Sequence, residues 1–450
     1  MQTVIETING IIWGIPVLLL ILVTGIILTY KTKGAQIRLF PAAVRHFLSS
    51  FQRRKGDGNS GYRALCTALA ATVGTGNIAG VAGAIAIGGP GVIFWMWVCA
   101  LLGMIIKFAE VTLALYYRKK DSAGHYTGGA MYMIRHGLSG KLNFLAILFC
   151  IFGIAATFGT GNAAQINAVT DGAKQLASLM GIRLGRTAIL VMGIVLSCLI
   201  TAAFRNGSSG IGRWAEILVP FASVIYIILA ILVLILRFRE IPFALQTIFY
   251  GAFSPKAVTG GVIGSFLVTL RTGVSRGIFT NEAGMGTASI AHATANEPDP
   301  IKQGYMGIIE VFLDTVVLCS LTALVILCSG TQVSYGTDTG ILLTMNAFAG
   351  VLGNWVQVVI SALVCIFAFA TILGWGLYGM TCAQYLFGKK ISSYFLFSET
   401  VVVIIASVTD TAIIWTVSEI FNGLMAIPNL VAVMILMPVF LKQIKSVQTL

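Results

Sequence analysis

The chain has 450 residues, of which 57% are hydrophobic and only 10% are charged, and its formal net charge is +13. A soluble domain carries about 25% charged residues, so this composition cannot make a surface that faces water. It excludes soluble enzymes, disordered regulators and coiled coils. The apolar stretches are continuous, which excludes a transmembrane β-barrel, whose strands alternate every second residue. The sequence therefore predicts an all-α polytopic membrane protein.

About eleven hydrophobic stretches come close to or exceed the ~20 residues that a membrane-spanning helix needs. In chain order they cover residues 8–30, 61–87, 90–117, 143–170, 186–204, 213–237, 258–290, 303–328, 352–380, 391–409 and 411–441. The loops between them are short, so we expect no separate soluble domain. The first stretch lacks a basic flank and a cleavage pattern of small residues, so we expect it to stay in the mature protein.

The positive charge predicts an orientation. With the N-terminus outside and the C-terminus in the cytoplasm, most of the 29 Lys and Arg residues fall on the cytoplasmic side. The densest cluster consists of Lys31, Lys33, Arg38, Arg45, Arg53, Arg54, Lys55 and Arg63. This bias is the positive-inside pattern of a protein of the cytoplasmic (plasma) membrane. We expect the protein to be surrounded by the lipid bilayer and to bind no nucleic acid, because no soluble domain presents a basic face.

Residues 37–48 interleave basic and apolar side chains, and we expect an interfacial helix on the cytoplasmic leaflet. A solvated loop is the alternative. The eight cysteines form no CxxC pair, and the four histidines show no metal-binding spacing. We therefore expect the cysteines to pack as small apolar side chains, and we expect no metal cluster and no organic cofactor.

Two stretches carry glycine, hydroxyl and amide groups at bilayer depth: the second, in residues 71–80, and the seventh, in residues 271–286. Unwound backbone in a membrane is tolerated only where it faces protein or a water-filled cavity. The two stretches are five apart, which predicts two five-helix halves in inverted orientation after one extra N-terminal helix, as in secondary transporters. The expected divisions are 1–60 (first helix and amphipathic segment), 61–240 and 241–441 (the two repeats) and 442–450 (cytoplasmic tail).

We place the breaks at Gly74–Gly76 and around Gly277–Phe279. A helix that stops leaves carbonyls with partial negative charge, and one that restarts presents N–H groups with partial positive charge. A zwitterionic amino acid together with Na⁺ needs both. Close helix packing through a GxxxG pair is the alternative explanation of Gly76 and Gly80, and we accept it for Gly80. It does not explain the neighbouring Thr75.

The polar side chains near the breaks are neutral oxygen donors, which suit Na⁺ better than H⁺: Thr72, Thr75, Asn77, Asn281 and Thr371. Asn162 and Gln165 in the fourth stretch are three apart, and we leave open whether they bond another helix or a substrate. Thr371 and Trp375 are four apart and share a helix face.

Charged residues at membrane depth are costly, so each one is a candidate. We expect Lys107 and Glu110 to pair with each other, since they are three apart on one helix. Glu310 and Asp314 lie one turn apart, and two like charges this close can hold a proton. This pair is the sequence argument for proton coupling.

Four further acids need an interpretation. We expect Arg271 or Arg276 to neutralise Glu282 near the second break. Glu216 and Glu399 lie near predicted span ends, where they can reach water. The sequence assigns no role to Glu419, which lies deeper.

These residues make the chain similar to the alanine/glycine:cation symporter family, the sodium:alanine symporters. The resemblance covers essentially the whole chain, and its most specific motifs are residues 74–81, 91–97, 275–284, 290–293 and 371–375. It implies membership of the amino acid–polyamine–organocation group and the inverted five-helix repeat of the neurotransmitter:sodium symporters, plus one N-terminal helix. It further implies a sodium-coupled symporter, not an enzyme, that imports small neutral amino acids such as alanine and glycine by alternating access.

The resemblance also implies roles for individual residues. Substrate-binding candidates are Thr75, Gly76, Asn77, Gln165, Phe279, Thr280 and Trp375, with the backbone at Thr75 and Gly76 meeting the substrate carboxylate. A sodium site would use the carbonyls of Ala70, Val73 and Phe367 and the hydroxyl of Thr371. Asn77 is also a candidate for a second cation position.

The chain departs from the family at two positions. It has Ala130 where members commonly have proline, and Met380 at a commonly acidic position on the inner exit path. Proton coupling through Glu310 and Asp314 stays open, and a channel for a small solute is a weaker alternative.

Overall fold

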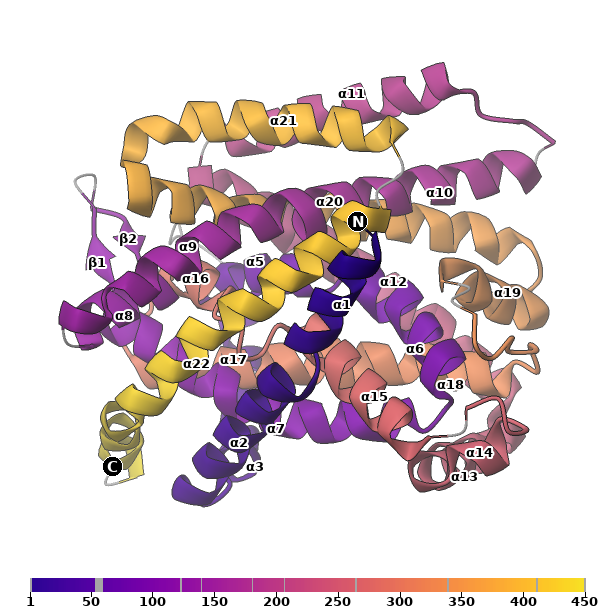
Figure 1. Cartoon of the computed structure of the whole chain (residues 1–450), viewed down its shortest axis with the longest axis horizontal. Coiled ribbons are helices and arrows are strands. Elements are labelled where there is room, and N and C mark those ends of the chain that lie inside the picture. The colour runs from indigo at the N-terminus through magenta and orange to yellow at the C-terminus, as the bar shows by residue number, and fades with distance from the viewer. Residues whose placement is uncertain are drawn as a thin grey trace.

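The structure is a computed structural model that describes residues 2–52, 60–121, 124–138, 140–179, 181–205, 207–263, 265–337, 340–409 and 412–448. Three members of the predicted cytoplasmic cluster, Arg53, Arg54 and Lys55, lie outside the described residues. Nearly all of the described chain is helical, as the composition predicts (Figure 1).

The elements up to the middle of the chain are α1 (Gln2–Ile12), α2 (Ile15–Lys31), α3 (Ala35–Arg38), α4 (Phe40–Gln52), α5 (Gly61–Thr72), η1 (Gly76–Gly80), α6 (Val81–Gly88), α7 (Val92–Tyr116), β1 (Lys119–Lys120), β2 (Tyr126–Thr127), α8 (Ala130–Gly137), η2 (Gly140–Leu142), α9 (Phe144–Ala156), η3 (Thr157–Ala163), α10 (Ala164–Leu179), α11 (Arg186–Phe204) and α12 (Gly207–Leu236). The remaining elements are η4 (Phe238–Glu240), α13 (Ile241–Phe253), α14 (Pro255–Val258), α15 (Phe266–Asn281), α16 (Ala288–Ala293), α17 (Pro300–Val311), η5 (Phe312–Cys319), α18 (Ser320–Cys328), α19 (Gly340–Leu352), α20 (Trp355–Phe387), η6 (Lys389–Ile391), α21 (Ser392–Val408) and α22 (Ala412–Gln448).

Nine helices in the described part of the chain are long and apolar enough to cross a membrane, and a tenth span results if α5 and the following η1–α6 segment are one bent span. The sequence predicts about eleven. The seventh predicted stretch accounts for the difference, because α15 has 16 residues and an irregular segment separates it from the 6 residues of α16. Neither piece alone reaches the length of a span, so the break itself lowers the count.

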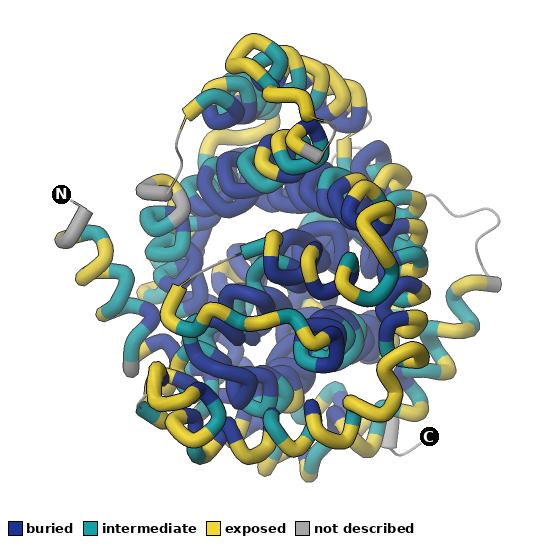
Figure 2. Tube along the Cα trace, turned by 90° about the vertical axis from the view of Figure 1, so that its right-hand side faces the viewer, coloured by how far each residue is buried: buried dark blue, intermediate teal, exposed yellow. Residues whose placement is uncertain are grey.

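The surface of α12 shows why the composition excludes a soluble fold. Ile217, Phe221, Val224 and Ile228 follow the helical repeat, and each is more than half exposed. The opposite face of α12 is buried and includes Tyr226. A helix that is apolar on both its exposed and its buried face belongs in lipid. Buried residues gather in the centre of the molecule and exposed ones on its periphery (Figure 2).

The long helices pack in groups that are distant in sequence. α11 and α21 lie side by side at one edge of the molecule, next to α10 and α20 (Figure 1). α7 packs against both α15 and α17, and α22 packs against α9. The extra N-terminal span consists of α1 and α2, and both contact α22 (Figure 1). Other helices pack against both interrupted spans: α12 and α20 pack against α5, and α7 packs against α15.

Several short elements differ from the prediction. The strands β1 and β2 form an antiparallel pair. α13 and α14 precede α15, so the seventh span begins at Phe266 rather than at residue 258. α22 continues to Gln448, so residues 442–448 of the predicted tail are helical. The predicted amphipathic segment 37–48 is helical within α3 and α4, and α4 packs on α17; its place at a membrane surface stays a prediction.

Candidate functional site

The second span breaks after α5, where the sequence places a break. α5 ends at Thr72, Val73 is extended, and the chain restarts as the π-helical η1 and then α6 at a bend of 51°. The Gly74 N–H donates to Oδ1 of Asn77 (2.9 Å) instead of to the Ala70 carbonyl one turn earlier. The Ala70 carbonyl therefore lacks its usual helical donor and is available to a ligand.

The seventh span breaks later than predicted. α15 continues through the expected break at Gly277–Phe279 and ends at Asn281. The chain then turns at Glu282, Gly284 and Gly286, whose φ angles are 53°, 90° and 76°, before α16 begins. Because positive φ suits glycine, two of these turn positions carry glycine.

Gly277 has a different role from the one predicted. A Cβ on Gly277 would lie 3.1 Å from the Cβ of Cys99, and one on Gly273 would lie 2.6 Å from the Cβ of Trp95, both on α7. These glycines let α15 approach α7 closely. Conversely, Gly80 was assigned to close packing, but an added Cβ there would meet no atom within 4 Å. The presence of a glycine alone does not distinguish a site of close helix packing from a site where the helix unwinds.

The two breaks, together with three other spans, enclose a small buried cavity. It is lined by Ala71, Thr72, Gly74, Thr75, Gly76, Thr160, Gln165, Phe279, Glu282, Met285, Thr371, Trp375 and Asn422. The predicted site residues among them are Thr75, Gly76, Gln165, Phe279, Thr371 and Trp375. The space between these side chains is about 20 Å³, which suits one or two water molecules. A larger solute therefore enters only when the surrounding helices move apart.

Hydrogen bonds connect the first break to two other spans. Thr75 Oγ1 donates to Gln165 Oε1 (3.2 Å), and Gln165 Nε2 donates to the Thr160 carbonyl (3.2 Å). Asn422 Nδ2, on α22, donates to the Thr160 hydroxyl (2.9 Å). The sequence pattern does not predict Thr160 or Asn422 as site residues. An amide in an otherwise apolar stretch is the signal that could have identified Asn422.

Two predicted residues lie behind the cavity wall. Asn77 Nδ2 donates to Oδ1 of Asp314 (2.7 Å). Thr280 donates its hydroxyl to the Gly277 carbonyl (2.9 Å), and its methyl group packs toward Gly76. Asn77 and Thr280 therefore support the wall of the cavity rather than line it.

The hydroxyl of Thr371 lies beside the first break. Thr371 is 2% exposed, and its Oγ1 has no hydrogen-bond partner among the described residues. A Cβ on Gly74 would lie 2.7 Å from this oxygen. The released Ala70 carbonyl comes from the end of α5, as does the Val73 carbonyl, and Phe367 precedes Thr371 by one turn of α20. Carbonyls at a broken helix together with a hydroxyl form a donor set that suits Na⁺.

The buried lysine pairs between helices rather than along its own helix. Lys107 Nζ lies 3.2 Å from Oε1 of Glu310 on α17, and both side chains are fully buried. Glu110, the predicted partner of Lys107, instead accepts a hydrogen bond from Asn429 on α22. The prediction of an i,i+3 pair is therefore wrong, because tertiary partners lie closer.

Glu310 and Asp314 do not face each other as a pair. The second oxygen of Glu310 lies 3.0 Å from Nε2 of His292. Asp314 accepts hydrogen bonds from Asn77 and from the hydroxyl of Thr315 (2.8 Å). Each acid therefore has partners of its own, and proton coupling through these two residues stays a prediction.

The arginines of α15 bind groups other than Glu282, contrary to the prediction. Arg276 Nη1 lies 3.5 Å from Oε1 of Glu419 on α22, and Arg271 donates to a backbone carbonyl of α1. Asn9 of α1 donates to Oε2 of Glu419 (2.9 Å). The extra N-terminal helix thus contacts the ion pair that joins α15 to α22.

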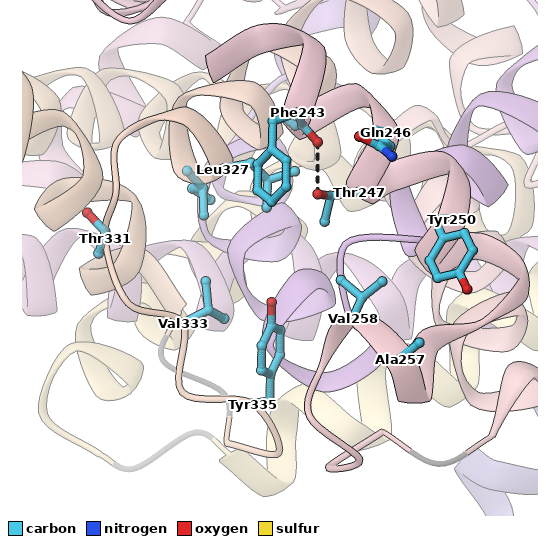
Figure 3. Close-up of a pocket in the computed structure, with 12 residues that line it drawn as sticks. Phe243, Gln246, Thr247, Tyr250, Ala257, Val258, Leu327, Thr331, Val333 and Tyr335 are labelled. Atoms are coloured by element: carbon cyan, nitrogen blue, oxygen red, sulfur yellow. Dashed lines mark hydrogen bonds between the residues drawn. The ribbon is translucent and has the colours of Figure 1, made fainter. Parts of the chain in front are cut away.

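Larger hollows are also present in the described chain, and the two most spacious of those found lie away from this cavity. One of about 460 Å³ is surrounded by α13, α14, α18 and the segment after α18, with Phe243, Tyr250 and Tyr335 in its wall (Figure 3). It contains no predicted site residue. The other, of about 410 Å³, lies between the β1–β2 hairpin and α20. Its wall includes Met380, so the departure from the family pattern faces this hollow.

Comparisons with known proteins agree with this geometry. The sodium:alanine symporter family matches residues 1–449. The sodium/alanine symporter AgcS of Methanococcus maripaludis is 39% identical over 449 residues, covering 99% of this chain and 96% of the relative. The probable sodium/glutamine symporter GlnT of Bacillus subtilis is 34% identical over 452 residues, covering 99% and 91%.

A solved structure supports the fold independently of sequence. The crystal structure of MhsT in complex with L-phenylalanine aligns with a TM-score of 0.60 at 16% identity, covering 83% of this chain and 89% of MhsT. The inverted five-helix repeat with one extra N-terminal helix is therefore confirmed. The protein is a polytopic membrane transporter and not an enzyme, and the chain belongs to the sodium:alanine symporter family.

Proposed function

We propose that the protein is a sodium-coupled symporter that imports small neutral amino acids, alanine and glycine, by alternating access. Amino acid symport follows from the family, and the names of its relatives favour sodium as the coupling ion. The observation that carries the proposal is the position of Thr371, whose unpartnered hydroxyl lies beside the broken end of α5 within the same cavity wall as Thr75 and Gln165.

Sodium binds in this proposal at the end of α5. The carbonyls of Ala70 and Val73 belong to the broken end of α5, and the carbonyl of Phe367 and the hydroxyl of Thr371 complete the set. A partial negative charge at a helix C-terminus favours a cation. The amino acid binds next to this ion, with its carboxylate at the N–H groups of the restarted η1.

The size of the substrate is limited by the packing around Trp375. A Cβ on Gly161 would lie 2.5 Å from the Cβ of Trp375, so this indole has no room to withdraw toward η3. Phe279 lines the opposite span, where a Cβ on Gly76 would lie 3.9 Å from its ring. The two aromatic side chains leave space for a methyl group but oppose a long side chain.

Alternating access requires that the helices around the cavity separate on one side at a time. The cavity has a volume of only about 20 Å³, which is too small for an amino acid, so no open path leads through this site. An open pore would leave such a path, so this arrangement opposes the channel alternative. Binding of ion and amino acid must favour each other, a reciprocal coupling of typically 1–3 kcal/mol.

The test is uptake of labelled alanine into proteoliposomes with sodium, lithium and proton gradients imposed separately. We expect a sodium gradient to drive uptake, with competition by glycine and serine but little by leucine. Counterflow exchange of labelled alanine distinguishes a transporter from a pore. Uptake driven by a proton gradient alone, without sodium, would contradict the proposed coupling.

The orientation belongs to the same proposal. The basic residues of the described chain favour the N-terminus outside and the C-terminus in the cytoplasm of the plasma membrane. In that orientation the Arg276–Glu419 pair lies toward the outside and the hollow beside Met380 toward the cytoplasm. A cysteine introduced at Lys445 should then react with a membrane-impermeant reagent only from the cytoplasmic side.

A further inference from the structure

One buried acid in the molecule has no role in the site described above. Glu399 lies midway along α21, and its exposed fraction is 0%. The sequence predicts a position near a span end, within reach of water, and this prediction is wrong because Glu399 is fully buried. Its carboxylate points into the protein between α21, α20, α11 and η3.

The neighbours of Glu399 are tightly packed and mostly apolar. A Cβ added to Gly376 of α20 would overlap both Oε1 of Glu399 and the ring of Phe204 of α11. Gly376 is therefore the residue that makes room for the carboxylate. Water and lipid are excluded from this side of the group, because the helix surfaces touch.

The polar partner on the facing element is Asn162 of η3, which is also 0% exposed. Within the described residues, neither oxygen of Glu399 and neither polar atom of the Asn162 amide has a hydrogen-bond partner. Two buried polar side chains that face each other without partners are unusual, because a buried polar group without a hydrogen bond loses its hydration and gains nothing in return.

No cation among the described residues pairs with Glu399. η3 carries no ionisable group. The ionisable groups on the other elements packed against α21 are Asp171 and Lys174 of α10, Arg186 and Cys198 of α11, Cys365, Tyr378, Cys382 and Tyr385 of α20, and Lys389 and Lys390 of η6. Asp171 and Lys174 pair with each other at 3.0 Å, and Lys389 pairs with Asp121 at 2.8 Å.

A bare carboxylate in this position would be strongly unfavourable, since several kcal/mol are needed to bury an unpaired charge. The group must therefore bind a cation. Sodium needs about five or six oxygen ligands, whereas this site offers the two carboxylate oxygens and the Asn162 oxygen among apolar neighbours. A proton needs one oxygen to bind and one acceptor, which the two side chains supply.

We propose that Glu399 and Asn162 form a proton-binding site that is loaded and unloaded during the transport cycle. A proton from solution adds to one carboxylate oxygen, the resulting O–H donates to Oδ1 of Asn162, and the amide N–H₂ donates to the other carboxylate oxygen. On release the proton returns to solution and the carboxylate regains its charge.

The site lies directly behind the substrate cavity. Gly376 follows Trp375 in α20, and Asn162 follows Gly161, whose backbone packs against Trp375. Loss of the proton leaves a charge that must be hydrated, which separates α21 from α20 at the level of Trp375. The inference rests on the proposed amino acid symport. It adds a proton as a second ion whose binding at Glu399 and Asn162 is coupled to transport.

The experiment follows protons and alanine in the same proteoliposomes. A pH-sensitive dye is trapped inside, a sodium gradient is imposed, the voltage is clamped with potassium and valinomycin, and labelled alanine is added. We expect the wild type to show an internal pH change that depends on alanine. In Glu399→Gln the pH change per alanine imported should be lost. The control Glu216→Gln neutralises an acid that has Arg63 as a partner at 2.9 Å, and it should keep the ratio.

A second measurement covers the case in which Glu399→Gln does not fold. Infrared titration of the purified wild type should show the carbonyl band of a protonated carboxyl group that is lost as pH rises, and Asn162→Ala should shift the midpoint of this loss. Alanine import without any proton movement, or an unchanged proton-to-alanine ratio in Glu399→Gln, would overturn the proposal, as would an infrared band insensitive to Asn162→Ala. A wild type that imports no alanine yet shows the titrating band would instead overturn the proposed symport.

Discussion

Both broken spans interrupt a helix inside the membrane, but the backbone conformation differs between the two breaks. The first break, between α5 and η1, is short, and a single side chain, Asn77, binds the released N–H of Gly74. The second break, between α15 and α16, is longer and uses positive φ angles at Glu282, Gly284 and Gly286. The first break leaves carbonyls free beside Thr371, whereas the second places Glu282 and Met285 in the cavity wall.

The comparison of the two breaks shows that glycine has three different roles in these membrane helices. At Gly74 the missing side chain makes room for the hydroxyl of Thr371, and at Gly286 it permits a left-handed backbone. At Gly277 it permits close contact with α7 and the helix continues. Substitution by alanine should separate these three roles.

The largest effect is expected for Gly286→Ala. Its φ of 76° is unfavourable for a residue with a Cβ, and the added atom would lie 2.6 Å from Cγ of Asn429. The left-handed strain and the overlap together should cost about 3 kcal/mol or more. We expect the folded fraction to fall, measured as the monodisperse transporter that survives heating in detergent.

Gly260→Ala is the matched control. Gly260 also has a positive φ, of 63°, but an added Cβ would meet no atom within 4 Å. It should lose only the left-handed strain, about 1–2 kcal/mol. Equal loss in both variants would mean that the contact with Asn429 does not matter at the second break.

Gly74→Ala should abolish transport with a smaller loss of fold. The added Cβ would lie 2.7 Å from Oγ1 of Thr371 and 3.9 Å from Oε1 of Gln165, so it occupies the proposed sodium position. We expect sodium-driven alanine uptake to fall about a hundredfold, or about 2.7 kcal/mol, at similar protein abundance. Gly80→Ala, in the same span but in open space, should transport normally.

The fold and the first break could be predicted because each has a strong local signal. Continuous apolar stretches predict the number of spans to within two, and Gly74 next to Thr75 and Asn77 combines flexible backbone with polar groups. The partners of Lys107 could not be predicted. Glu110, three positions from Lys107, competes with Glu310, 203 positions away, and only the packing of α7 on α17 decides between them.

The predicted position of the second break was wrong for a related reason. Gly273 and Gly277 look the same in sequence as Gly284 and Gly286, yet two pack against α7 and two adopt positive φ. The burial of Glu399 was missed because a position near a predicted span end carries no information about the depth of the neighbouring helices. Both errors concern tertiary contacts, which hydrophobic periodicity does not report.

Thr371→Ala tests the ion side of the first break. The hydroxyl is buried and has no hydrogen-bond partner in the described part of the chain, so its removal should cost little in stability but should weaken sodium binding. We expect the sodium concentration for half-maximal uptake to rise about tenfold, which corresponds to about 1.4 kcal/mol. Thr371→Ser keeps the hydroxyl and should remain near the wild type. A sodium dependence that is identical in Thr371→Ala and wild type would exclude this residue as a ligand.

The smallest effect is expected where α15 meets α22. The Arg276–Glu419 pair is partly exposed, with side chains 24% and 15% accessible, so its contribution is screened and should be no more than about 1 kcal/mol. Arg276 also lies over the ring of Phe279, 5.9 Å from its centroid, and so connects this pair to the cavity wall. Arg276→Gln should therefore change the apparent alanine affinity only about two- to fivefold, and less at high ionic strength.

The double variant Arg276→Gln, Glu419→Gln decides how that change arises. If the two residues act as a pair, the double variant should behave like either single variant rather than as the sum of both. Additive losses would indicate that Arg276 acts through Phe279 and that Glu419 acts through Asn9 of α1. A decrease of more than about a hundredfold in the apparent alanine affinity of Arg276→Gln alone would exceed what a screened ion pair contributes. It would place the guanidinium in contact with the substrate carboxylate and move the anion-binding role from the first break to the second.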